Sequence, residues 1–138
     1  NLMSSTLLTE DTGIPFHKLQ AEQIQRFRDA WEKAGHDREP RVSVSRSIFP
    51  LTTDMDRAYF GRDRDDQDQV GHLEGGLARF GRSYAAEPDK LIEELREDEA
   101  IAAADTLLLT IPNQLGVEYN AHVMESILND VAPELGWR

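Results

Sequence analysis

The sequence contains no cysteine, and this absence removes several kinds of chemistry. Disulfide cross-links, thiolate nucleophiles and cysteine-ligated zinc are all excluded. A chain without cysteine is also compatible with a reducing compartment, and we therefore expect a cytoplasmic protein.

Long apolar runs and positive charges are scarce as well. No uninterrupted apolar stretch approaches the roughly 18 residues of a membrane-spanning helix, and no basic segment followed by an apolar one indicates a signal peptide. With 15 lysines and arginines against 26 acidic residues, the net charge is -11. The electric field of a chain with this negative charge repels phosphate groups, so we expect neither a nucleic acid nor a membrane as a partner.

Several catalytic signatures are missing. The four histidines are far apart and none belongs to an HExxH arrangement, so we expect no metal site. The glycines between residues 71 and 81 match neither the P-loop nor the GxGxxG spacing. No Gly-x-Ser-x-Gly elbow occurs, and hydrolase chemistry therefore has no support.

The spacing of apolar residues predicts alternating strands and helices. Strands are expected over residues 1–8, 41–49, 83–86 and 106–111, and helices over residues 17–34 and 54–60, from residue 87, and over residues 117–135. Thr52 or Thr53 is expected to cap the short second helix. The apolar run from Thr106 is typical of a parallel strand covered on both faces.

Two segments give weaker signals. Residues 61–69 are rich in Arg, Asp and Gln and are expected to be exposed or disordered, whereas residues 70–82 are interpreted as a helical region weakened by several glycines. The chain also opens directly on strand-like residues without an initial Met, and we therefore expect it to be truncated at its N-terminus.

The alternation of strands and helices predicts an α/β fold with parallel βαβ units and right-handed crossovers. A complete eight-fold barrel needs about 250 residues. About four units in 138 residues therefore suit either half of such a barrel or a small open sheet. The pattern alone does not choose between the two.

Six stretches along the chain together resemble the luciferase-like monooxygenase family. The resemblance spans nearly the whole chain and is weakest over residues 61–82. It is carried by residues 1–6 (NLMSST), 30–36 (AWEKAGH), 42–47 (VSVSRS), 87–91 (EPDKL), 104–109 (ADTLLL) and 112–120 (PNQLGVEYN).

This resemblance implies that residues 1–138 are the C-terminal half of a (β/α)8 TIM barrel, with FMN, or alternatively a deazaflavin, at the C-terminal mouth. The parent enzyme would use reduced flavin and molecular oxygen on a small organic substrate, and this chain alone would be incomplete. Because a half barrel leaves open strand edges, we also expect a homodimer. The alternative is a non-catalytic, acidic α/β binding or interaction module, suggested by the acidic surface and the lack of a catalytic constellation.

The candidate site residues lie at the C-terminal ends of the expected strands, where barrel enzymes place their active sites. Ser4, Ser5 and Thr6 are candidates for hydrogen bonds to the flavin, although polar residues that simply alternate in a strand explain them equally well. Arg46 is a candidate for a cofactor phosphate or carbonyl, and the alternative for it is an ion pair with one of the many acids.

Two later strand ends supply further candidates. Asn113 and Gln114 follow the last strand and are expected to bind substrate, with a polar turn as the alternative. Arg82, Ser83 and Tyr84 precede a helix whose N-terminal amides could bind an anion, with ordinary helix capping as the alternative. The sequence assigns no catalytic residue.

Overall fold

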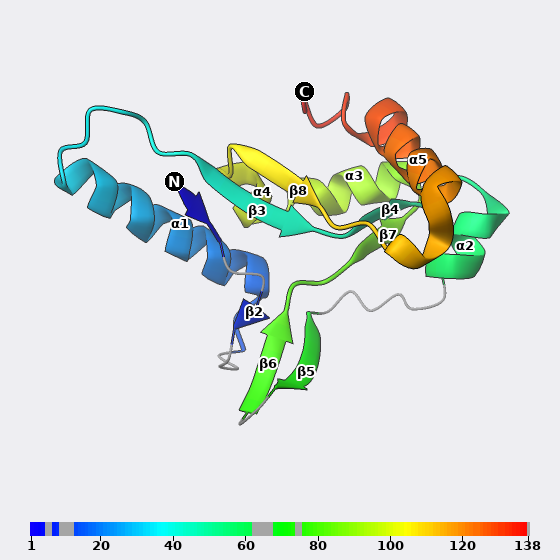
Figure 1. Ribbon diagram of the computed structural model, residues 1–138, viewed down its shortest axis with the longest axis horizontal. Coiled ribbons are helices and arrows are strands. Elements are labelled where there is room, and N and C mark those ends of the chain that lie inside the picture. The colour runs from blue at the N-terminus through cyan, green and yellow to red at the C-terminus, as the bar shows by residue number, and fades with distance from the viewer. Residues whose placement is uncertain (5–6, 9–12, 62–67, 74–75, 138) are drawn as a thin grey trace.

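The computed structural model describes residues 1–4, 7–8, 13–61, 68–73 and 76–137. Within these ranges a bent strand runs through the middle of the molecule as β3 (Val42–Arg46) and β4 (Ile48–Pro50). β1 (Leu2–Met3) and β8 (Thr106–Leu109) pair in parallel with the two sides of β3, and β7 (Tyr84–Ala86) pairs in parallel with β4 (Figure 1). The predicted α/β class with parallel strands is therefore confirmed.

The order of these strands bears on the half-barrel prediction. In a (β/α)8 barrel each strand lies beside the next strand along the chain, which would place β8 beside β7. Among the described strands β8 lies instead beside β3. The structure supports parallel sheets and helices, and the half barrel stays a prediction.

The expected helices form close to their predicted bounds. They are α1 (Phe16–Lys33), α2 (Asp54–Phe60), α3 (Pro88–Arg96), α4 (Glu99–Ala103) and α5 (Gly116–Ser126), and α5 continues as a π-helical turn, η2 (Ile127–Val131). A short 3-10 helix, η1 (Asn113–Leu115), precedes α5, and Gly116 joins the two with φ 82°, a left-handed conformation that glycine adopts without strain.

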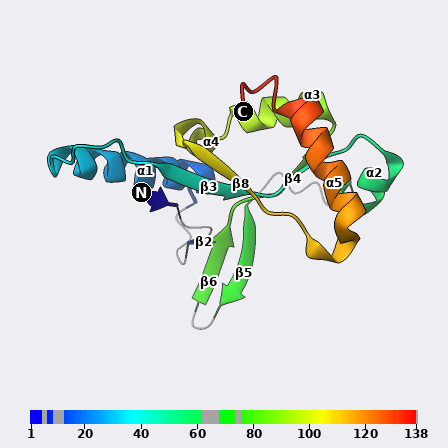
Figure 2. The same ribbon diagram turned by 45° about the horizontal axis from the view of Figure 1, so that its top comes forward.

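The helical interpretation of residues 70–82 is wrong. β5 (Gln69–Leu73) and β6 (Gly76–Phe80) form an antiparallel hairpin, β2 (Leu7–Leu8) pairs with β6, and this sheet extends away from the parallel strands (Figures 1 and 2). Glycine is a poor helix former, and here it permits close packing, since a Cβ on Gly71 would lie 3.3 Å from the ring of Phe80. Residues 62–67 of the predicted exposed segment lie outside the described residues.

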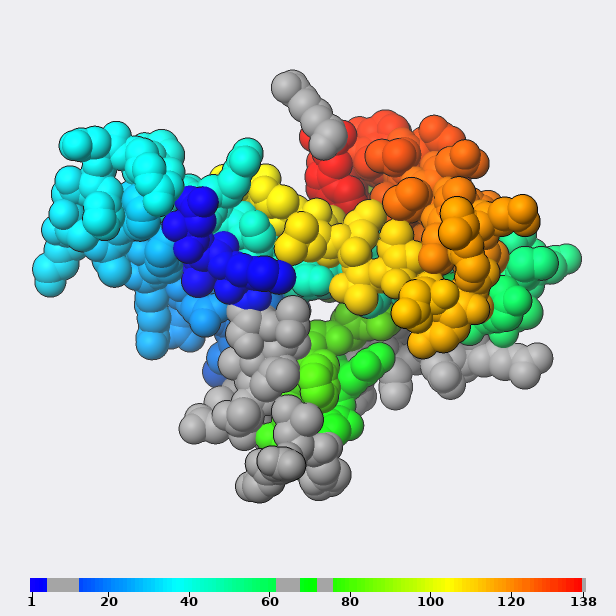
Figure 3. All heavy atoms as spheres, viewed as in Figure 1, coloured from blue at the N-terminus to red at the C-terminus, as the bar shows by residue number. Residues whose placement is uncertain are grey.

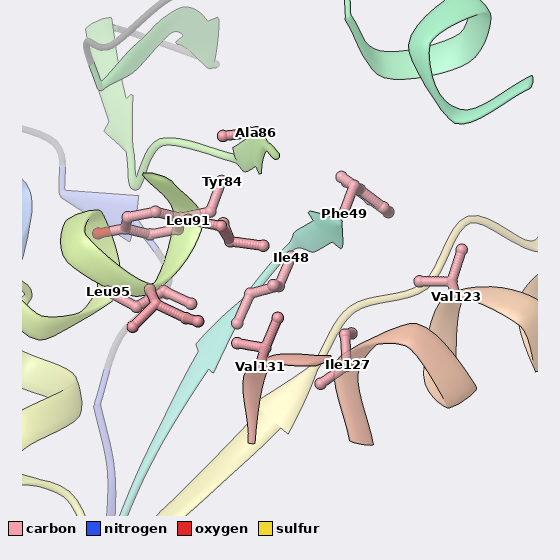
Figure 4. Close-up of a cluster of buried hydrophobic side chains, with 10 residues drawn as sticks. Ile48, Phe49, Tyr84, Ala86, Leu91, Leu95, Val123, Ile127 and Val131 are labelled. Carbon is pink, nitrogen blue, oxygen red and sulfur yellow. The ribbon is translucent and has the colours of Figure 1, made fainter. Parts of the chain in front are cut away.

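The core lies mainly between the β4–β7 pair and the C-terminal helices. Figure 4 shows the apolar side chains of β4, β7, α3, α5 and η2 converging in one cluster. Its most buried members come from segments far apart in the sequence: Ile48, Tyr84, Ala86, Leu91, Leu95, Val123, Ile127 and Val131. This packing fixes α2 and α5 at the carboxyl ends of the parallel strands.

Candidate functional site

The segments after β4 and β8 bring a group of polar side chains together at the carboxyl ends of the parallel strands. In α/β proteins this edge of the sheet is where ligands bind. β4 leads through Thr52 and Thr53 into α2, and β8 leads through η1 into α5. Thr52, Thr53 and Asp56 from the first segment meet Tyr119 and His122 from the second, and we name these five residues the carboxyl-edge cluster.

Asp56 is the centre of the carboxyl-edge cluster, and it is only 1% exposed. Its Oδ2 accepts hydrogen bonds from the Thr53 amide at 2.7 Å and the Thr53 hydroxyl at 2.8 Å. Its Oδ1 accepts a hydrogen bond from the Tyr119 hydroxyl at 2.6 Å. The Nε2 atom of His122 lies 3.0 Å from Oδ1 and 3.1 Å from Oδ2, so the carboxylate is held from both sides.

The local sequence explains how Asp56 reaches this position. Thr53 is the N-cap of α2, and its hydroxyl accepts a hydrogen bond from the Asp56 amide while the Asp56 carboxylate accepts one from the Thr53 amide. This reciprocal capping box satisfies two amides at the start of the helix. On the other side, Tyr119 and His122 are three residues apart on α5 and therefore share one helical face.

The surroundings of Asp56 keep it ionised. Burial raises the pKa of the Asp56 carboxyl, but the hydrogen bonds from Tyr119, His122 and Thr53 outweigh burial and hold that pKa well below its ordinary range. Burial, together with the hydrogen bond to Asp56 and its charge, raises the pKa of Tyr119 above its ordinary value. At neutral pH the cluster thus contains a carboxylate and a neutral phenol.

This arrangement gives His122 a defined chemical capacity. An ionised carboxylate only accepts hydrogen bonds, so Nε2 of His122 donates to Asp56 and Nδ1 becomes the acceptor atom of the neutral ring. The His122 side chain is 33% exposed, whereas Asp56 is enclosed. Tyr59 meets Tyr119 edge to face, with ring centroids 5.2 Å apart, and extends the aromatic surroundings. A carboxylate that orients a partly exposed imidazole is suited to proton transfer.

Arg46 lies in a different place, inside a buried polar network. Its Nε donates to Oδ2 of Asp98 at 2.7 Å and its Nη2 donates to Oδ1 at 3.0 Å, while the Tyr84 hydroxyl donates to Oδ2 at 2.6 Å. Asp98 also accepts hydrogen bonds from the amides of Ala100 and Ile101 as the N-cap of α4. The structure therefore shows the ion pair that was the alternative for Arg46, and binding of a cofactor by Arg46 stays a prediction.

The other predicted site residues do not join the carboxyl-edge cluster. Ser4 is buried, and its hydroxyl donates to Oε1 of Gln23 at 2.8 Å. Ser5 and Thr6 lie outside the described residues. Asn113 and Gln114 are exposed in η1, just before the helix that carries Tyr119 and His122. Their roles in cofactor and substrate binding stay predictions.

A cavity of about 400 Å³, a size common for ligand pockets, lies between the start of α1, the β5–β6 hairpin and α3. Arg79 and Arg82 line it, and Arg82 pairs with Glu94 at 2.7 Å. The lining also carries four carboxylates, those of Asp68, Glu94, Glu97 and Asp98. Four carboxylates against two guanidinium groups do not fit the phosphate of FMN. Ser4 and Arg46 do not line this cavity, and both are hydrogen-bonded within the protein.

Sequence reasoning missed Asp56, Tyr119 and His122 as site residues. The available signals were the Thr53-x-x-Asp56 capping pattern and the three-residue spacing of Tyr119 and His122 on an amphipathic helix. Neither signal shows that the two helices meet, because 66 positions separate Asp56 from His122.

Within the described ranges, no three His, Asp or Glu side chains gather in a way that could hold a metal ion. None of the helices in that part of the chain has the length and apolar character needed to span a membrane. No protein-family model, no curated protein and no solved structure matches the chain.

Proposed function

We propose that this chain is the C-terminal part of a cytoplasmic, flavin-dependent oxidoreductase of the luciferase-like type, in which His122 transfers a proton to or from a small organic substrate. The resemblance of residues 87–120 and of the earlier stretches to that family supports the cofactor class and the use of reduced flavin and oxygen. The observation that carries the site is the imidazole of His122, oriented by the buried Asp56 at the carboxyl ends of parallel strands.

The proton transfer follows from the charges in the carboxyl-edge cluster. Nδ1 of His122 accepts a proton, and the resulting imidazolium is stabilised by the Asp56 carboxylate 3.0 Å from Nε2. Asp56 stays ionised throughout, because the hydrogen bonds from Thr53 and Tyr119 favour its charged form. Positioned general bases of this kind typically accelerate a reaction by about 10²- to 10⁴-fold.

The half barrel belongs to this proposal. The parallel βα units and the position of the cluster at the carboxyl edge support it. It requires β8 to lie beside β7 in the longer protein, whereas β8 lies beside β3 in this chain.

The proposed cofactor class is tested by titrating FMN, and in parallel a deazaflavin, with the purified chain and following the quenching of flavin fluorescence. We expect saturable quenching by the folded chain and none by the chain unfolded in urea. His122→Gln is the matched control and should quench flavin fluorescence as the wild type does. Its amide can still donate to Asp56, and the proposal gives His122 no contact with the flavin. Quenching of neither flavin by the folded wild type contradicts the proposal.

A second candidate function is the acidic interaction module. The observation that favours it is the uncharged, partly exposed edge strand β8, described below. If the chain binds no flavin but associates through β8, the module is the better description. Saturable flavin binding favours the oxidoreductase.

A further inference from the structure

The edge strand β8 lacks the features that usually prevent strands from pairing with other chains. Among the strands that the structure describes, β8 pairs only with β3 and is the last strand of its sheet. Its sequence is Thr106 followed by three leucines, without charge or proline. Natural edge strands are commonly protected by lysine, proline or a bulge. In Figure 3, β8 (yellow) lies open at the surface beside the C-terminal helix.

The apolar surface continues from β8 toward the C-terminal helices. Leu108 is 39% exposed and Leu109 is 37% exposed. A groove of about 570 Å³ runs along the strand toward η2 and the C-terminus, and most of its lining is apolar: Ile101, Ala104, Leu107, Leu109, Leu128 and Trp137 are among its residues. Leu128 and Met124 on the neighbouring helix are exposed as well.

The charges around β8 allow a second negatively charged chain to approach. Asp105, the acid that directly precedes the strand, accepts a hydrogen bond from the Val42 amide at 2.8 Å and lies 3.7 Å from Arg28. Its charge is therefore compensated within the same chain. The net charge of -11 opposes self-association, whereas β8 itself carries no charged side chain and adds no repulsion where two copies would meet.

We propose that a second copy of this chain pairs its β8 with β8 of the first, across a twofold axis. A twofold axis brings identical edges together in antiparallel orientation, so the β8 leucines of the two copies lie side by side. The two three-stranded sheets, in the order β1-β3-β8, join into one continuous sheet. Leu128 and the apolar groove then cover the partner's leucines. This pairing does not depend on the proposed flavin chemistry, but it uses the free edge of β8, which a closed barrel would not leave.

The size of this surface sets the expected affinity. β8, the lining of the groove and Met124 provide fewer residues than the roughly 20 to 30 on each side of a standard interface. The charges elsewhere on the two chains also repel. We therefore expect a reversible dimer with a dissociation constant in the micromolar range rather than an obligate one.

Sedimentation velocity over a wide range of concentrations tests the pairing, with Leu108→Lys as the disrupting variant. The matched control is Val70→Lys, which carries the same net charge and replaces a side chain that is 54% exposed on β5. Both variants make the chain less negative, so a loss of association in only one of them cannot come from overall repulsion. Circular dichroism melts confirm that both are folded.

We expect the wild type and Val70→Lys to shift from monomer to dimer as concentration rises, and Leu108→Lys to dimerise at least tenfold more weakly. Amide hydrogen exchange in residues 106–109 should slow as the dimer forms. A wild type that stays monomeric throughout overturns the proposal. So does a dimer that Leu108→Lys leaves intact, because association then uses another surface.

Discussion

Replacing Asp98 by Asn should destabilise the protein more than any change at its exposed ion pairs. The Asp98 carboxylate receives two hydrogen bonds from Arg46, one from Tyr84 and two from backbone amides at the start of α4. Both members of the Arg46–Asp98 pair are almost completely enclosed. The variant keeps the shape of the side chain but leaves the guanidinium of Arg46 buried without a counter-charge.

The magnitude follows from this burial. Removing one partner of a buried ion pair typically costs about 3 to 5 kcal/mol, because the remaining charge is left uncompensated. The free energy of unfolding of a whole domain is about 5 to 15 kcal/mol, so the variant loses a large part of its stability. For a chain of this length, 1 kcal/mol corresponds to about 3 °C, and we expect the melting temperature to fall on the order of 10 °C or more.

Urea unfolding followed by circular dichroism measures this loss, with thermal melting as a second readout. The control is Lys18→Gln, which removes the exposed pair of Lys18 with Glu99 at 3.7 Å. Exposed pairs contribute less than about 1 kcal/mol, so the control should unfold nearly as the wild type does. If Asp98→Asn loses no more stability than Lys18→Gln, the buried network of Arg46, Tyr84 and Asp98 does not contribute to stability as predicted.

Two further predictions concern the carboxyl-edge cluster. Thr53→Ala removes the N-cap of α2 and should cost about 0.5 to 2 kcal/mol in urea unfolding, whereas no loss would show that the capping box does not stabilise the helix. The lowered pKa of Asp56 means that the folded chain stabilises the ionised carboxylate more than the unfolded chain does. Its contribution to stability is therefore complete above about pH 5 and disappears as the pH falls toward the folded pKa. Asp56→Asn should be less stable than the wild type at neutral pH and lose less stability on acidification, and equal slopes of unfolding free energy against pH would contradict this.

Local signals were enough to predict much of the fold. Two of these signals are the apolar spacing of α1 and α5, and a third is the threonine before α2. Each signal involves only residues close together in the sequence, and the structure confirms all three elements. The alternation of valine and serine from Val42 likewise predicts β3, whose valines are buried. These elements need no information from the rest of the chain.

Other features depend on contacts between distant segments. β6 is a strand partly because it pairs with β2, some 70 residues earlier, and no local pattern shows this pairing. The three leucines of β8 suggested a strand covered on both faces, but β8 is an edge strand with two exposed leucines. Nothing in the sequence distinguishes Asp98 from the other 25 acidic residues as the partner of Arg46, because 52 positions separate the two.

In the proposed site, Asp56 holds His122 with Nδ1 free of hydrogen and able to accept a proton. Long-range ¹H–¹⁵N NMR correlations on uniformly ¹⁵N-labelled protein distinguish the two neutral tautomers of each histidine, and the signals of His122 are assigned by their loss in His122→Gln. The predicted result is the Nε2–H tautomer at a pH where the ring is neutral, shifting toward the Nδ1–H tautomer in Asp56→Asn. If His122 carries its proton on Nδ1 in the wild type, Nε2 is not donating to Asp56, and the proposed proton-transfer site is contradicted.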